Sequence, residues 1–195
     1  PLYNNLHRNV IFKGGETIDK PIDYYQASTP EKLWKVLDET CDKDKGCEVL
    51  AIPHNANLAG GLMYKTETLW GKSYTKEMAL KRQISEPISE IVQAKGTSEC
   101  FQDANAPYGS SDEECNFEQV VQTKICTGDE VEGEECTPLC SSLIVPLGGF
   151  MGACVEPSDF MRGAMRRGLE TKVDIGANPF KFGFIGSTDT HNGTP

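Results

Sequence analysis

Four apolar runs along this chain have the length and flanking residues of β-strands. Each run is followed closely by glycine, proline or polar residues, which commonly end strands. The runs are Val10–Phe12, Val49–Ile52, Ile88–Gln93 and Phe182–Ile185. We therefore expect four strands, and we expect the second and the last to be buried.

Three segments between these runs predict helices. The first is "ASTPEKLWKVLDET", in which Ser28 or Thr29 can cap the helix and Pro30 suits its first turn. Its buried face is expected to hold the residues that recur at helical spacing, namely Leu33, Trp34 and Leu37. A second helix is expected in "TKEMALKRQI".

The third helical segment is "EPSDFMRGAMRRGLETKVDIG". Ser158 is its expected N-cap. The apolar side is expected to comprise Phe160, Met161, Ala164, Met165 and Leu169.

Strands and helices alternate along the chain, and this order predicts an α/β fold with a mainly parallel sheet. In such folds the carboxyl ends of the strands face the ligand site. The residues that follow each strand are therefore the first place to look for chemistry.

Composition excludes some classes of function. The formal net charge is −10, so a nucleic-acid-binding surface, which needs clustered Lys and Arg, is not expected. No stretch approaches the roughly 20 apolar residues of a membrane span. No signal-peptide pattern is visible at Pro1.

Eight cysteines are present, a high and even number, and none forms a C-x-x-C pair. This pattern favours disulfides over a zinc or redox site, and hence an extracellular or periplasmic location. Cys41 and Cys47 flank a short polar loop and are expected to form a local bridge. Residues 100–140 are acidic and cysteine-rich, and we interpret them as a disulfide-stapled surface insertion. Their acidic run suits calcium, but it lacks EF-hand spacing, which favours a solvated loop.

Three of the predicted strands end in groups that suit metal ligation or acid-base chemistry. His54 follows the second strand, Glu99 the third, and Asp189 with His191 the last. Imidazole and carboxylate groups together suit zinc, manganese or iron. In an extended segment, Asp189 and His191 would project to the same side and reach one ion. For each of these candidate ligands the alternative is a purely structural role. For His7 a structural role is favoured.

Four segments resemble a known family in the same order along the chain: "LHRNVIFKG", "AIPHNANLAGGLMY", "ISEIVQAKGTSE" and "NPFKFGFIGSTDTHNGTP". They are similar to the domain-of-unknown-function 3604 family, whose members are thought to be related to the PHP (polymerase and histidinol phosphatase) superfamily of amidohydrolase-like barrels. The resemblance runs from about His7 to Pro195 and is interrupted by the cysteine-rich insertion.

The resemblance implies a distorted β/α barrel whose strand ends hold two or three divalent metals. The metals would activate water for the hydrolysis of phosphate esters. By motif, His54 matches the histidine of the "IPH" segment, and Asp189 and His191 match the closing D-x-H pair. Glu99 is a weaker candidate, inferred from its position alone.

One departure from the PHP pattern is the lack of an H-x-H motif, which supplies two ligands in that superfamily. With three histidines in all, the chain is not expected to complete a multi-metal cluster alone. We therefore expect residues 1–195 to be one part of a longer polypeptide whose remainder supplies the missing ligands.

Two functions remain open from the sequence. The first is part of a metal-dependent hydrolase that acts on a small-molecule or phosphate-ester substrate. The second is a non-enzymatic extracellular protein that keeps the PHP-like fold without a complete metal cluster and serves in structure or binding.

Overall fold

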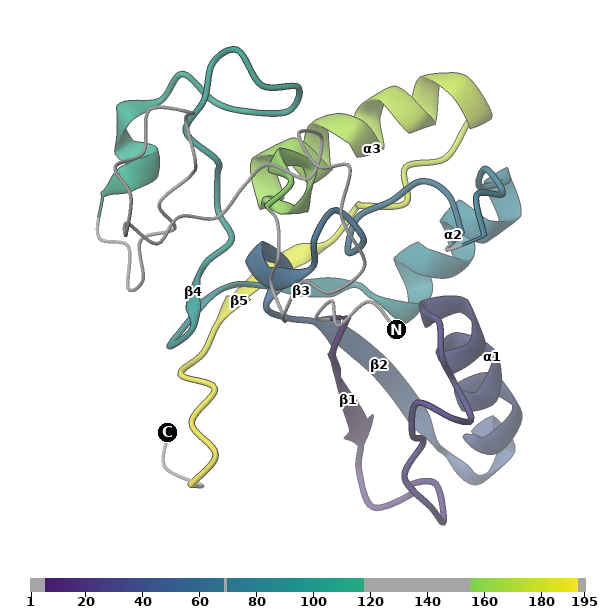
Figure 1. Cartoon of the computed structure of the whole chain (residues 1–195). Coiled ribbons are helices and arrows are strands. Elements are labelled where there is room, and N and C mark those ends of the chain that lie inside the picture. The colour runs from purple at the N-terminus through teal and green to yellow at the C-terminus, as the bar shows by residue number, and fades with distance from the viewer. Residues whose placement is uncertain (1–5, 69, 118–154, 193–195) are drawn as a thin grey trace.

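The computed structural model describes residues 6–68, 70–117 and 155–192 (Figure 1). They form a mixed α/β arrangement with two small sheets. Strand β1 (Arg8–Lys13) pairs with β2 (Glu48–Pro53). Strand β3 (Ile88–Gln93) lies between β4 (Gly96–Thr97) and β5 (Gly183–Gly186).

The expectation of a mainly parallel sheet is wrong for the described strands. β1 runs antiparallel to β2, β4 runs antiparallel to β3, and β5 alone runs parallel to its partner β3. Alternation of strands and helices records their order but not their direction. The two-residue connection between β3 and β4 permits only a hairpin. The described strands form two separate sheets, and these do not close into a barrel.

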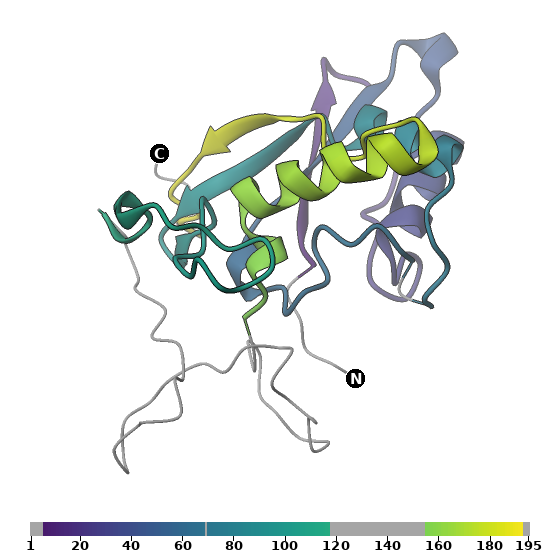
Figure 2. The ribbon, with the colours of Figure 1, turned by 90° about the horizontal axis from the view of Figure 1, so that it is seen from above.

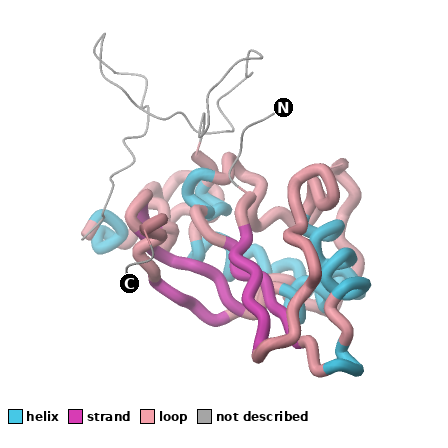
Figure 3. The backbone as a smooth tube through the Cα atoms, turned by 90° about the horizontal axis from the view of Figure 1, so that it is seen from below, coloured by secondary structure: helices cyan, strands magenta, loops and turns pink. Residues whose placement is uncertain are grey.

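The two sheets meet where β2 lies next to β3, as the tube in Figure 3 allows the reader to follow. One bond at this contact runs from a side chain to the backbone: Ser89 Oγ donates to the carbonyl oxygen of Pro53 at 3.3 Å. Tyr64 Oη lies 2.5 Å from the same Ser89 hydroxyl. This junction places the carboxyl end of β2 beside β3.

Helices α1 (Pro30–Thr40) and α2 (Lys76–Ser85) begin where the sequence indicates. The hydroxyl of Thr29 caps α1 by accepting from the Lys32 N–H at 3.3 Å. Trp34 and Leu37 are buried on α1, as expected, and the Cys41–Cys47 disulfide follows its last turn.

Helix α3 (Met161–Ile175) lies along the β4-β3-β5 sheet (Figures 1 and 2). Its expected cap at Ser158 is wrong. Ser158 is buried within a short 3-10 helix, Pro157–Asp159, and the cap position of α3 is Phe160, without a side-chain cap.

The apolar side of α3 is only partly as expected. Met161 and Ala164 are buried, but Met165 and Leu169 are exposed, and the helix instead buries small residues that include Gly163 and Gly168. A Cβ atom on Gly168 would lie 2.2 Å from Asn178 Oδ1, so close packing of the helix requires glycine there.

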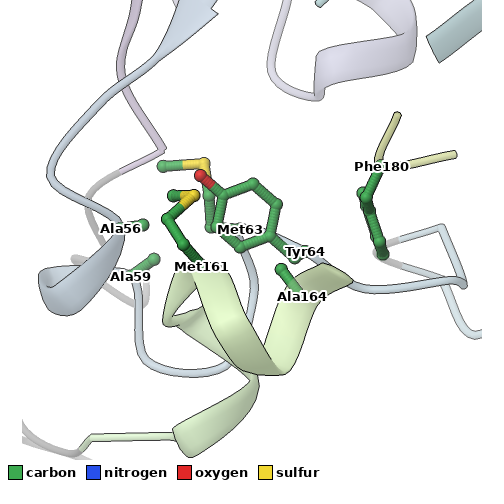
Figure 4. Close-up of a cluster of buried hydrophobic side chains, with 7 residues drawn as sticks. All are labelled: Ala56, Ala59, Met63, Tyr64, Met161, Ala164 and Phe180. Atoms are coloured by element: carbon green, nitrogen blue, oxygen red, sulfur yellow. The ribbon is translucent and has the colours of Figure 1, made fainter. Parts of the chain in front are cut away.

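The main core cluster joins the chain that follows β2 to α3 and to the residues before β5 (Figure 4). Its members are Ala56, Ala59, Met63, Tyr64, Met161, Ala164 and Phe180. Ile91 of β3 packs against this cluster. The core therefore holds the segment after β2 against the sheet.

The fully buried carboxylate of Asp159 fixes the same segment. Asp159 Oδ2 accepts from the Gly61 N–H at 2.5 Å, and Oδ1 accepts from the Met63 N–H at 3.0 Å. Burial raises the pKa of Asp159 to about 7, even though these N–H groups favour the ionised form.

Strand β5 was expected to be buried, and this is wrong. It spans Gly183–Gly186, one residue later than predicted, and Phe184 and Ile185 are 48 % and 42 % exposed. β5 is an edge strand of its sheet in the described part of the chain, so one of its sides has no neighbouring strand.

Two disulfides lie among the described residues. Cys41–Cys47 is the local bridge expected from the sequence, and the second bridge is Cys100–Cys115. Within the described part of the predicted insertion, Phe101 packs against Val155 and Phe160. Residues 118–140 of the insertion, which hold the second of its two acidic stretches, lie outside the described residues. No helix in the described ranges is long and apolar enough to cross a membrane.

Candidate metal and substrate site

The pairing of β1 with β2 brings two histidines together. The register places Arg8 opposite Pro53, so His7 and His54 are next to one another at the same end of the ladder. The His54 N–H donates to the His7 carbonyl oxygen at 3.3 Å, and the two ring centroids are 5.6 Å apart. His7, for which a structural role was favoured from the sequence, thus lies beside His54.

Asn55 links this pair to β3. Its backbone N–H donates to Glu90 Oε1 at 3.3 Å, and its Nδ2 lies 3.3 Å from His54 Nδ1. Asn55 has a φ of 56°, in the left-handed region that Asn tolerates better than most residues. Within the described part of the chain, its buried Oδ1 atom has no hydrogen-bond partner. An oriented acceptor without a donor is therefore present beside His54.

Asp189 reaches the same region from the end of β5. Its carboxylate accepts a hydrogen bond from Gln93 Nε2 at 3.1 Å and forms an ion pair with the ammonium group of Lys95. The Ala94 N–H also donates to the Thr188 carbonyl at 3.2 Å, which ties the chain after β5 to the β3–β4 turn. Asp189 is therefore held by residues at the carboxyl end of β3.

The electrostatics of the group reflect burial and mutual proximity. Burial lowers the pKa of His54; the charge of Asp189 opposes this effect, and those of His7, Lys95 and Arg8 add to it. The imidazole thus favours the neutral form, which can bind a metal or accept a proton.

The pKa values of the two carboxyl groups, Glu90 and Asp189, shift in opposite directions. Burial raises the pKa of Glu90, and the negative charge of Asp189 acts in the same direction. The hydrogen bond from Lys95 holds the pKa of Asp189 below its usual range. Asp189 therefore carries negative charge more readily than Glu90 does.

The other two predicted ligands lie differently. His191 is exposed, and its Nδ1 lies 3.0 Å from the carbonyl oxygen of Asp189. Asp189 has a φ of 51°, so the D-x-H segment is not extended there and the expected same-side geometry does not apply. Glu99 forms an ion pair of 2.7 Å with Arg162 of α3.

The structure thus brings His54 near Asp189 and adds His7, Glu90, Asn55 and Lys95, which sequence reasoning did not assign to a site. The available signal for Glu90 was an acidic residue inside an apolar strand run. For His7 the signal was its place before a strand, which becomes informative only when the antiparallel partner is known. The described residues contain no group of three or more His, Cys, Asp and Glu side chains placed to hold a metal ion.

A cleft of about 730 Å³ opens beside His7. Its walls come from the start of β1, the loop before α1 and the segment after β2, and include Arg8, Thr29 and Lys65. The volume lies within the range of small-molecule sites. A ligand in this cleft would contact His7 directly.

Comparison with known proteins gives one match. A family model described as "Protein of unknown function (DUF3604)" matches residues 1–195. No curated protein and no solved structure matches the chain.

Proposed function

The chain belongs to the DUF3604 family of proteins of unknown function, and from this premise we propose that it is part of a metal-dependent hydrolase acting on phosphate esters. The observation that carries the proposal is that His7 and His54 lie side by side at one end of the β1–β2 ladder, with ring centroids 5.6 Å apart. Glu90 accepts a hydrogen bond from the neighbouring Asn55, and the charge of Asp189 acts on the pKa of His54.

The donor set fits a divalent metal in kind. His7 and His54 offer imidazole nitrogens, and Glu90 and Asp189 offer carboxylate oxygens, which suits zinc, manganese or iron. The unpartnered Oδ1 of Asn55 supports the fit, because a buried acceptor without a donor is costly unless a cation or a ligand pairs with it.

These residues are too few to supply all the ligands of two or three ions. The ligand residues proposed here are His54 and Asp189, together with His7 and Glu90 from the geometry. Glu99 and His191 stay predictions from the sequence. We propose that two or three ions would need further ligands from residues outside the described ranges, including other parts of the same polypeptide.

The chemistry assigned to the chain's own residues follows from their environments. A bound divalent ion would supply Lewis acidity and would lower the pKa of water toward neutrality. His54, favoured as neutral imidazole, would bind without first losing a proton. Lys95 would keep Asp189 ionised and in place, and it would have to release that carboxylate if Asp189 becomes a ligand.

The relationship to PHP barrels is part of the same proposal. It rests on the resemblance of the four sequence segments. In this proposal the strand ends of the two described sheets contribute to a larger site. Export to an extracellular or periplasmic space is also proposed. The two disulfides among the described residues and the lack of a spanning helix there are compatible with it.

A second candidate function is a non-enzymatic extracellular protein with an incomplete cluster. Two observations favour it: the described residues hold no preformed three-ligand group, and Lys95 already neutralises Asp189. The two functions differ in whether metal is bound.

Elemental analysis of the purified full-length protein, with a panel of phosphomonoester and phosphodiester substrates, tests the proposal. A hydrolase should contain stoichiometric zinc, manganese or iron and should lose its activity with a chelator. Absence of bound metal, with no uptake of added zinc or manganese, would leave the binding function in its place.

A further inference from the structure

The 730 Å³ cleft beside His7 has a mainly apolar wall. Its larger apolar side chains come from the start of β1, the loop before α1, α1 itself and the segment after β2, and all but Tyr24 are half-buried. They are Leu6, Val10, Ile22, Tyr24, Leu33 and Leu62. Leu6 also packs against the main core cluster, which fixes that part of the wall. The cleft therefore exposes apolar surface that an apolar ligand would remove from water.

The polar side chains of the same wall are largely engaged in bonds within the protein. The side chain of Arg8 is 2 % exposed and is paired with Glu86 at 2.8 Å. Asp23 Oδ1 accepts from the Gln26 N–H at 3.0 Å, and the Thr29 hydroxyl caps α1. Apolar walls with a small number of polar groups are typical of small-molecule sites.

Tyr24 adds an aromatic surface to the cleft. Its side chain is 69 % exposed, and its ring centroid lies 6.1 Å from that of Tyr25, with the two ring planes at 75°. Much of the Tyr24 ring is therefore open to a ligand. A second aromatic ring can contact it in an offset-stacked or edge-to-face arrangement, which is favourable beyond the burial of apolar area.

We propose that this cleft binds an apolar organic group of the substrate, above all an aromatic ring, through Ile22, Tyr24 and Leu33. The inference rests on the proposed hydrolase for its meaning, because His7 lines the cleft and its ring centroid lies 5.6 Å from that of His54. In that hydrolase the cleft would hold the alcohol part of a phosphate ester, with the phosphoryl group toward the histidine pair. Binding of the aromatic group does not itself require a metal.

Calorimetric titration of 2-naphthol into the full-length protein in the presence of EDTA tests the inference. The metal-free wild type should bind this neutral aromatic probe. Tyr24→Ala and Ile22→Ser should each weaken binding about fivefold or more, because each removes from the contact apolar surface equivalent to at least one methylene group.

The matched controls are Tyr25→Ala and Ile84→Ser. Tyr25 and Ile84 are 94 % and 72 % exposed, and neither belongs to the cleft wall. Both controls should bind 2-naphthol within about twofold of wild type, well below the loss of one methylene contact. Circular dichroism checks folding, and if Ile22→Ser does not fold, the comparison of Tyr24→Ala with Tyr25→Ala decides.

The inference is overturned if the metal-free wild type does not bind 2-naphthol, or if the cleft variants and their controls bind it equally. Sedimentation of the same proteins adds a third test. An oligomer that dissociates only in the cleft variants would make the cleft a contact between chains, and this result too would overturn the inference.

Activity measurements keep this inference separate from the proposed hydrolase. The metal-loaded wild type should prefer 1-naphthyl phosphate to methyl phosphate in kcat/KM, and Tyr24→Ala should reduce that preference while Tyr25→Ala does not. A protein that binds 2-naphthol in the cleft but neither takes up metal nor hydrolyses either ester would refute the hydrolase and leave the apolar site standing. A hydrolase that shows no preference between the two esters and no binding of 2-naphthol would refute the apolar site alone.

Discussion

Replacement of Glu86 by glutamine removes the buried carboxylate that Arg8, Arg82 and Trp34 share. Glu86 Oε1 accepts from Arg8 Nε and from Trp34 Nε1 at 3.1 Å, while Oε2 lies 3.1 Å from Arg82 Nη2. An amide supplies one acceptor oxygen and no charge. In Glu86→Gln, two buried guanidiniums would face a neutral group, and one set of donors would face an NH₂.

The expected cost follows from the burial of all three charged groups. Glu86 is 1 % exposed, and the side chains of Arg8 and Arg82 are 2 % and 3 % exposed. Breaking a buried ion pair by removing one partner costs about 3–5 kcal/mol. This is a large share of the 5–15 kcal/mol by which domains are typically stable.

Urea unfolding followed by tryptophan fluorescence measures the loss, because the Trp34 indole is hydrogen-bonded to Glu86 itself. With a slope of about 1–3 kcal/mol per molar urea, the midpoint should fall by at least about 1 M. The control is Glu39→Gln, which removes a largely exposed carboxylate that lies 3.7 Å from Lys35. It should change the free energy of unfolding by less than about 1 kcal/mol.

The pH dependence gives a second readout. Burial alone would raise the pKa of Glu86, but the charges of Arg8 and Arg82 outweigh burial and hold it below its usual range. Glu86 thus stabilises the fold above the carboxylate's ordinary pKa, and this contribution is lost as the pH falls through its folded value. A Glu86→Gln protein as stable as Glu39→Gln at neutral pH would refute the buried network as described.

Three further predictions concern other parts of the molecule. Replacing both Cys41 and Cys47 by alanine should lower the free energy of unfolding by about 2 kcal/mol, measured by urea denaturation, because the disulfide closes a short loop; no change under oxidising conditions would contradict this. The pKa of Asp159 is raised from its unfolded value of 3.8 to about 7, so its stabilising contribution is full below about pH 4 and is lost as the pH rises to about 7. Asp159→Asn should remove that slope from the pH–stability curve, and an unchanged slope would refute the assignment. Lys95→Met should tighten zinc binding about fivefold, because Asp189 no longer has an ammonium partner; weaker binding would count against competition between Lys95 and the metal.

Local signals in the sequence predicted most elements because local interactions determine them. The Thr29 cap and the apolar spacing of Trp34 and Leu37 locate α1, and α2 lies within its expected segment. Strand runs such as Ile88–Gln93 coincide with strands in the structure. The Cys41–Cys47 bridge followed from its short spacing alone.

The direction of the strands could not be predicted from the sequence, because it depends on long-range packing. The antiparallel pairing of β1 with β2 is what places His7 beside His54, and neither residue's local pattern encodes it. The exposure of Phe184 in β5 and of Leu169 in α3 likewise depends on which side of each element meets the core.

The candidate site was therefore predicted in part. His54 and Asp189 were identified as strand-end groups, and the structure places them within electrostatic range of each other. Glu90 and Asn55 became visible only with the β2–β3 junction, and Lys95 only with the ion pair that joins the β3–β4 turn to the chain after β5, since each contact links distant segments.

Calorimetric titration of zinc and manganese into the metal-free full-length protein tests the central claim most directly. Wild type should bind metal, His54→Ala and His7→Ala should each weaken binding at least tenfold, and Glu48→Gln, which changes an exposed carboxylate on β2, should not. All four proteins should give the same circular dichroism. Equal metal affinity in wild type and in both histidine variants, or no metal binding by wild type, would contradict the proposed metal site.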